Sequence, residues 1–169
     1  MSQTDRTRGA TANRAADGFM QAAVMERYGA PDVLELREVK KPAPEDDEVL
    51  IRVRAASIND WDWELLRGAP LNRMFGGLLK PRLRILGCDV AGQVEAVGAK
   101  IRTFKPGDEV FGDLCASGFG AFAEYVCAPE SSLACKPPGM TFVEAAAIPQ
   151  AGMLAVQGLI DVGRIKGGQ

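Results

Sequence analysis

The stretch EVLIRVRAASI, from Glu48 to Ile58, indicates the fold more clearly than any other part of the sequence. Val49, Ile51 and Val53 occupy every second position, and arginines stand between and after them. Alternation of apolar and charged residues is typical of a β-strand that buries one face. The segment just before it, KKPAPEDD, is rich in proline and acid and is typical of a turn. The stretch therefore predicts a long strand that begins close to Glu48.

Short apolar segments of similar character lie on both sides of this stretch. VLELREV, from Val33 to Val39, alternates in the same way. Downstream, glycine and proline turns separate four further runs: ILGCDVAGQVEAVG, DEVFG, GAFAEYVCAP and SLACKP. We expect the first of these runs to form a strand, a tight glycine passage and a second strand. Many short strands with such turns are typical of a small β-barrel or β-sandwich.

Helical patterns are concentrated near the end of the chain. TFVEAAAI places Glu144 three residues after Thr141, which is the capping-box arrangement. The run after Pro149 spaces its apolar residues as a helix does. A short helix is also expected at NDWDWELLRG, with Asn59 as its N-cap, whereas residues 69–84 show no period and predict a loop. The predicted fold class is mainly β with terminal helices.

The composition excludes several classes of protein. The chain has 169 residues, 20 basic and 22 acidic, and a net charge of −2, so no clustered basic surface for nucleic acid is expected. Its most apolar region, residues 142–162, is interrupted by Glu144, Pro149 and Gln150, which argues against a membrane span. Residues 1–18 offer little apolar surface to bury, and we expect a disordered tail or a start-site extension there.

The four cysteines and a glycine motif both have a plain structural interpretation. No two cysteines form a C-x-x-C pair, and the sequence has no histidine to complete a mixed zinc site. We expect small buried residues in a reducing compartment, at Cys88, Cys115, Cys127 and Cys135. GFGAFA, residues 118–123, matches a dinucleotide motif, but the segment after it alternates as a strand does. A phosphate site needs a helix there, so we reject that function.

The order of EVLIRVRAASIND, ILGCDVAGQVEAVG, FKPGDEVFG, GAFAEYV and EAAAIPQAGMLA resembles the medium-chain dehydrogenase/reductase superfamily. It is most similar to the zinc-independent quinone oxidoreductase branch. The resemblance implies a GroES-like β-barrel catalytic domain over residues 19–149. Residues 150–169 would be a helix that leads toward a Rossmann domain absent from this chain. It also implies a cytoplasmic enzyme that uses NADPH to reduce quinones or conjugated carbonyls.

The resemblance also indicates that the usual catalytic metal is missing. Alcohol dehydrogenases of the superfamily have Gly-His-Glu where this chain has Gly87-Cys88-Asp89. Their cysteine ligand after the long strand falls near Ile58 and Asn59, and their four-cysteine structural-zinc loop is absent. A lone Cys88 beside Asp89 is not a zinc site, so no zinc is expected. Quinones and enones are electron-poor and can accept hydride through positioning, a dry pocket and one hydrogen bond.

The resemblance assigns provisional roles to several side chains. Asn59 matches the asparagine of the N-x-x-D passage, which faces nicotinamide and substrate; its amide could donate to a carbonyl, cap the helix, or do both. Asp62 matches the acid of that passage and either orients Asn59 or, the favoured alternative, holds the turn. Trp61 and Trp63 are expected in the core more than in a pocket wall. Trp63 could still shape an aromatic-binding pocket, and Cys88 is expected to line it.

Two further positions carry expectations of their own. Asp89 should pair with an arginine or cap a backbone turn, because an unpaired buried carboxylate is costly. Leu154 stands where the superfamily has a threonine that contacts the nicotinamide amide, so cofactor geometry or affinity should differ. The two tyrosines, Tyr28 and Tyr125, do not lie where enoyl-thioester reductases have their acid. We therefore disfavour that branch.

An alternative from a different class is a non-catalytic fragment or interaction module with the same fold. Without the Rossmann domain, the 169-residue chain is expected to be inactive and to bind no NADPH. Its last helix would then expose an apolar stripe, and such a stripe is prone to self-association. The stripe lies within residues 150–162 and consists of Met153, Val156, Leu159 and Ile160.

Overall fold

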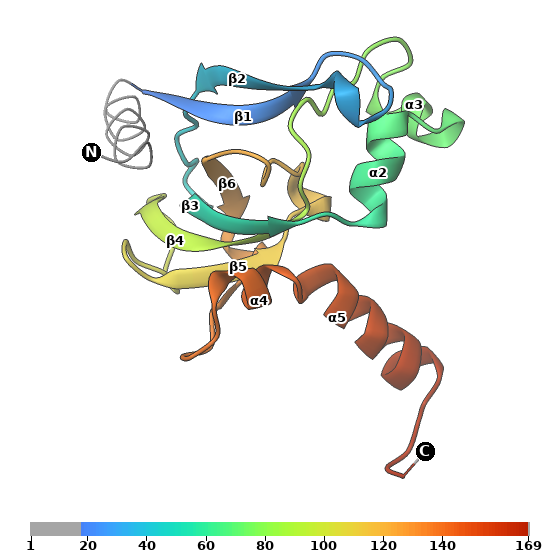
Figure 1. Ribbon diagram of the computed structural model, residues 1–169. Coiled ribbons are helices and arrows are strands. Elements are labelled where there is room, and N and C mark those ends of the chain that lie inside the picture. Colours follow the sequence, from blue (N-terminus) through green and yellow to red (C-terminus); the bar gives the residue numbers. More distant parts are fainter. Residues whose placement is uncertain (1–17, 169) are drawn as a thin grey trace, which may run out of the picture.

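The computed structural model describes residues 18–168 (Figure 1). The tail predicted for residues 1–18 lies outside the described residues, apart from Gly18. The described part is mainly β, as the sequence predicts, and contains two antiparallel sheets. The smaller sheet pairs β1 (Phe19–Met25) with β2 (Leu34–Lys40). The larger has the order β6 (Tyr125–Pro129), β3 (Glu48–Ser57), β4 (Asp89–Val97), β5 (Glu109–Asp113), β7 (Leu133–Cys135).

β3 is the strand predicted from EVLIRVRAASI, and it is buried on both faces at its start. Val49 and Ile51 point into the main core, as the alternation predicts. Leu50 on the opposite face is also buried, because it packs with Met20 and Tyr125 beneath the smaller sheet. Figure 1 shows β1 and β2 lying across that side of β3. The alternation of β3 was therefore predicted correctly, but it did not reveal that the smaller sheet covers the opposite face of the strand.

β4 is one continuous strand, where the sequence predicts a strand, a glycine passage and a second strand. Gly92 lies inside it, opposite Val53 of β3. A Cβ atom at Gly92 would collide with the Arg52 carbonyl oxygen, so the glycine permits the close pairing of the two strands. The tight passage lies just before the strand instead, at Gly87, which has φ +98°.

The helices on one side of the sheets extend further than the sequence predicts. α2 (Asp60–Arg67) begins after Asn59 and ends at Gly68, as expected. The predicted loop that follows contains a second helix, α3 (Pro70–Gly76), which contradicts that prediction. A proline at the helix start and two contacts explain it. The Arg73 Nε donates to the nearby Gly68 carbonyl oxygen at 2.7 Å, and the Tyr28 hydroxyl, distant in sequence, donates to the Gly77 carbonyl oxygen at 2.7 Å.

The terminal helices follow the prediction. α4 (Phe142–Ala146) has the Thr141–Glu144 capping box and packs Ala145 and Ala146 against β3 and β4. α5 (Pro149–Val156) continues into a π-helical segment (Gln157–Val162) and ends at Gly163. Figure 1 shows this helical segment leaving the sheets. Three 3-10 turns complete the described elements, at Pro31–Val33, Cys115–Ser117 and Glu130–Ser132.

The larger sheet is open within the described residues. β6 and β7 form its two edges, and no ladder joins them over residues 18–168, so the predicted closed barrel is not formed there. Isolated bridges, Ala22 to Ala123 and Val24 to Ile85, tie the smaller sheet to the rest. In this part of the chain no helix has the length and apolar character needed to cross a bilayer.

Candidate functional site

A buried carboxylate is the centre of the candidate site. Asp89, the first residue of β4, is 0% exposed. Its carboxylate accepts hydrogen bonds from the Ser57 hydroxyl at 2.9 Å and the Asn59 Nδ2 at 3.1 Å. It also accepts the Gln150 backbone N–H at 3.2 Å. The predicted arginine partner is absent from this set, and the other predicted alternative, capping of backbone, is what occurs.

The third donor comes from the start of a helix. Gln150 follows Pro149 in the first turn of α5, where backbone N–H groups have no partner within the helix. Asp89 supplies that partner. Burial raises the pKa of Asp89, and the hydrogen bonds from Asn59, Ser57 and Gln150 partly oppose that rise because they favour the charged form.

Asn59 and Asp62 join α2 to the segment before β4. They form a capping box in which the Asp62 carboxylate accepts the Asn59 backbone N–H at 2.9 Å. The other Asp62 oxygen accepts the Gly87 backbone N–H at 2.8 Å. Asp62 is 2% exposed, so it does not reach a ligand directly. Its bonds are those of a residue that holds the turn, which is the alternative favoured from the sequence.

The Asn59 side chain faces the interior of this network. Its Nδ2 lies 3.0 Å from the Ser57 Oγ, 3.1 Å from an Asp89 oxygen and 3.3 Å from the Cys88 Sγ. Three acceptors are more than its two N–H groups can serve at once. The predicted capping role of Asn59 rests on the capping box that it forms with Asp62 at the start of α2. In this arrangement its amide N–H groups are directed at protein acceptors.

Cys88 lies beside Cys115 and Asp113, which sequence reasoning did not select as site residues. The two sulfurs of Cys88 and Cys115 and a carboxylate oxygen of Asp113 all lie within 4.8 Å of one another. Cys88, predicted to line the substrate pocket, is fully buried and lines neither of the two cavities described below. Burial, with a smaller effect from Asp62, raises the pKa of Cys88 to about 11. Burial also raises the pKa of Cys115.

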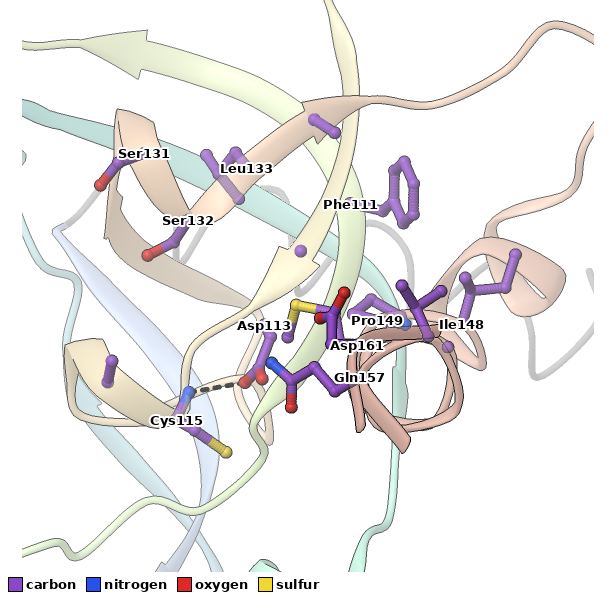
Figure 2. Close-up of a pocket in the computed structure, with 16 residues that line it drawn as sticks. Phe111, Asp113, Cys115, Ser131, Ser132, Leu133, Ile148, Pro149, Gln157 and Asp161 are labelled. Atoms are coloured by element: carbon purple, nitrogen blue, oxygen red, sulfur yellow. Dashed lines mark hydrogen bonds between the residues drawn. The ribbon is translucent and has the colours of Figure 1, made fainter. Parts of the chain in front are cut away.

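Two cavities meet at Cys115. The helix-side cavity lies between β5 and α5, has a volume of about 840 Å³, and includes Asp113, Met153 and Gln157 in its wall. Figure 2 shows this cavity and the hydrogen bond from the Cys115 backbone N–H to the Asp113 carboxylate. The Trp61 cavity, of about 770 Å³, is lined by Trp61, Leu65, Leu71, Arg82, Cys115 and Phe119. Both are large enough for a small organic ligand.

Trp63, predicted for the substrate pocket, and Leu154, predicted as a cofactor contact, line neither of these two cavities. Trp63 is 38% exposed and stacks with the Arg67 guanidinium at 4.6 Å, outside both cavities. Trp61, 53% exposed, lines a cavity in its place, so neither tryptophan is in the core. Leu154 is 61% exposed on α5 and lines neither cavity.

Sequence reasoning did not select four residues that complete the site: Ser57, Asp113, Cys115 and Gln150. Gln150 had a usable signal, because it follows a proline at a predicted helix start. No sequence signal pointed to Cys115 and Asp113, because only the pairing of β4 with β5 brings them close to Cys88.

The ligand set of a zinc alcohol dehydrogenase does not fit this site. Ile58 and Asn59 bring no sulfur to the position after β3, and the Asn59 amide nitrogen donates hydrogen bonds instead. The sequence contains no histidine to occupy the position of Cys88. No step of a reaction is therefore assigned to that metal.

Comparison with known proteins agrees with this architecture. Residues 45–138 match the alcohol dehydrogenase GroES-like domain. The chain is 36% identical over 154 residues to the chloroplastic quinone-oxidoreductase homolog of Spinacia oleracea, covering 88% of this chain and 44% of that protein. It is 35% identical over 157 residues to the chloroplastic NADPH-dependent alkenal/one oxidoreductase of Arabidopsis thaliana, covering 89% of this chain and 39% of that protein.

A solved structure shows the same fold. The quinone oxidoreductase from Coxiella burnetii superposes with a TM-score of 0.77 and 30% sequence identity, covering 88% of this chain and 47% of that one. The chain thus spans less than half the length of these relatives. By its family match and its relatives, the chain belongs to the alcohol dehydrogenase GroES-like domain family of the medium-chain dehydrogenase/reductase superfamily.

Proposed function

We propose that this chain is the catalytic-domain portion of an NADPH-dependent oxidoreductase that transfers hydride to quinones or related conjugated carbonyls. The observation that carries the proposal is the pair of cavities that meet at Cys115 beside the buried network of Asp89. One cavity has an aromatic and aliphatic wall suited to a flat acceptor. The relatives named quinone and alkenal/one oxidoreductases support the same class of reaction.

The acceptor would bind in the Trp61 cavity. Trp61 offers a ring on which a quinone can stack, and Leu65 and Phe119 keep water away from it. Arg82, in the same wall, can donate a hydrogen bond to a carbonyl oxygen. Because such acceptors are already electron-poor, this hydrogen bond and correct positioning replace a Lewis acid. The proposed reaction is therefore independent of zinc.

NADPH, when bound, supplies the hydride. We place its nicotinamide end near the helix-side cavity, whose wall includes Gly152 and Met153 of α5. Asn59 and Leu154 remain our predicted cofactor contacts; Leu154 is accessible but offers only apolar contact, because it has no hydroxyl. Most of the nucleotide site would belong to a Rossmann domain outside these 169 residues. We therefore predict that the chain alone is inactive and binds no NADPH.

The test is NADPH oxidation by a form of the protein extended through the following domain. A small benzoquinone, a naphthoquinone and an aliphatic enone are offered as acceptors, with a saturated ketone as the control. We expect turnover with the first three, in the presence of a metal chelator, and none with the ketone. Tight NADPH binding without turnover of any acceptor would refute the proposal.

A second candidate function is a non-catalytic interaction module. It is favoured by the apolar side chains of the helical segment 149–162 that remain about half exposed, among them Met153, Val156 and Leu159. Calorimetry of the 169-residue chain with NADPH bears on both candidates. Micromolar binding would show that this chain carries a working nucleotide site and would contradict the predicted inertness.

The cellular location also remains a prediction. We propose the cytoplasm, as the resemblance implies, although the relatives from Spinacia oleracea and Arabidopsis thaliana are named as chloroplastic. Fractionation of the source cells with an antibody against residues 18–168 would distinguish the two.

A further inference from the structure

We propose that Cys88, Asp113 and Cys115 bind a thiophilic divalent cation, with Zn²⁺ as the best fit. Their two sulfurs and a carboxylate oxygen lie within 4.8 Å of one another. Zinc bound tetrahedrally at about 2.3 Å from each sulfur would hold the sulfurs about 3.8 Å apart. Closing the site therefore needs side-chain shifts of about 1 Å or less. No other group of three such donors comes this close among residues 18–168.

The backbone holds these three residues in place. Cys88 directly precedes β4, and Asp113 ends β5, which is paired with β4. The Leu114 backbone N–H donates to the Cys88 carbonyl oxygen at 2.7 Å, which extends the pairing past the strand end. Cys115 begins a 3-10 turn, and its own backbone N–H is fixed to the Asp113 carboxylate at 2.7 Å. A site on such a framework is preorganised for a ligand.

Each sulfur also faces an amide donor. The Asn59 Nδ2 lies 3.3 Å from the Cys88 Sγ, and the Gln150 Nε2 lies 3.2 Å from the Cys115 Sγ. Hydrogen bonds from N–H groups stabilise the charged form of their acceptor, and such outer partners orient metal ligands. These amides can therefore serve as outer partners that orient the two sulfurs, and metal binding would have to displace the thiol protons that burial favours.

The surroundings are acidic and lack a fixed cation. Asp62 and Asp89 are buried next to Cys88, and Asp113 belongs to the site itself. Within the described residues no lysine or arginine lies at ion-pair distance from any of these three carboxylates. A divalent ion would supply the missing positive charge. Asp113 and Cys115 border the helix-side cavity, so a water molecule can occupy the fourth position.

This ligand set differs from the one found in alcohol dehydrogenases of the superfamily. Only Cys88 stands at a ligand position of those enzymes, while Asp113 and Cys115 come from the end of β5. The proposed hydride transfer does not use this ion. Binding can therefore be measured on the chain alone, with neither NADPH nor a quinone present.

The experiment uses the reduced, tag-free 169-residue chain, which has no histidine to bind metal elsewhere. Zn²⁺ affinity is measured by competition with a chromophoric chelator, and Co²⁺ is added separately to reveal thiolate-to-cobalt charge transfer. We expect one ion per chain and a clear charge-transfer band. C115S should lower Zn²⁺ affinity at least tenfold and reduce the band, whereas D113N should lower affinity and keep the band.

Matched controls come from the two cysteines outside the site, Cys127 and Cys135. C127S and C135S should bind Zn²⁺ as tightly as the wild type. Because Cys88 is fully buried, C88S is interpreted only together with its circular dichroism, and the half-buried Cys115 decides the outcome. Zn²⁺ should also raise the unfolding temperature of C135S but not of C115S. Unchanged affinity in C115S, or an equal loss in C135S, would overturn the proposal.

Discussion

The backbone N–H of Gln150 donates to the carboxylate of Asp89 at 3.2 Å, although the two residues are 61 positions apart in the sequence. This bond ties the first turn of α5 to the first residue of β4. Since Asp89 also accepts from Asn59, the orientation of α5 and the start of α2 depend on one buried carboxylate. The site is therefore sensitive to small changes at that residue.

Asp89→Asn should destabilise the fold. The amide keeps the size of the side chain but replaces one acceptor oxygen with a donor that faces the donors of Ser57, Asn59 and Gln150. Leaving buried polar groups unpaired costs about 1–3 kcal/mol. Urea unfolding measures the loss, and the exposed Asp32→Asn is the control, with an expected effect within about 0.5 kcal/mol. Equal stability of the two variants would contradict the structural role of Asp89.

Quinone binding should be reported by one tryptophan and not by the other. The sequence has two tryptophans, of which Trp61 lines a cavity and Trp63 does not. In Trp63→Phe, fluorescence of the remaining Trp61 should be quenched saturably by 1,4-naphthoquinone. In Trp61→Phe, quenching of Trp63 should rise only in proportion to quinone concentration, as collisions do. Saturation in the second variant alone would place the acceptor elsewhere.

The four cysteines should react with iodoacetamide at very different rates at pH 8. Thiolates are the reactive species, and burial raises the pKa of Cys127 to about 12 and that of Cys88 to about 11. Cys135 is exposed and should be modified first. Peptide mapping by mass spectrometry after short exposures gives the order. Modification of Cys88 before Cys135 in the folded protein would show that Cys88 is not buried as described.

The capping box of α4 should contribute stability that depends on pH. Hydrogen bonds from the backbone and side chain of Thr141 lower the pKa of Glu144 below its usual value. A lowered folded-state pKa stabilises the protein above the unfolded-state pKa, and this stability is lost as the pH falls through the folded value. The difference in unfolding free energy between wild type and Glu144→Gln should therefore shrink in acid. If the difference in unfolding free energy between the two proteins grew toward low pH, the proposed contribution of the Glu144 carboxylate would be contradicted.

Self-association is predicted for the chain alone. Met153, Val156, Leu159 and Ile160 are all exposed on the helical segment that leaves the sheets (Figure 1). Sedimentation velocity over a hundredfold range of concentration should show dimers or larger species. The double variant Leu159→Glu/Ile160→Glu should remain monomeric, with Leu36→Glu on the exposed face of β2 as a control that leaves association intact. A monomeric wild type at all concentrations would refute the prediction.

Local patterns predicted much of the fold. Alternation located β2 and β3, turn residues separated the later strands, and the Thr141–Glu144 spacing placed α4. α3 was missed because its seven residues are too few for a period to emerge and its contacts are tertiary. The smaller sheet over Leu50 was also invisible, because a buried second face does not alter the alternation of the first.

The site could be predicted only in part. Asn59 and Asp62 were selected by resemblance, and Asp89 was noted because burying an unpaired carboxylate is costly; the three residues lie together. Cys115 and Gln150 were not, since their positions depend on strand pairing and helix docking across long stretches of chain. Trp63 was chosen over Trp61 because a helical period does not reveal which of two nearby aromatic rings borders a cavity.

The helix-side cavity and the Trp61 cavity share part of their walls, at Cys115 and Ala116. Molecules bound in the two cavities would therefore contact the same two residues. A ligand in the helix-side cavity should change the affinity of the Trp61 cavity for its own ligand, and thermodynamic linkage requires the effect to be reciprocal. Such cooperativity would pass through Cys115 and Ala116, the two residues that both walls share.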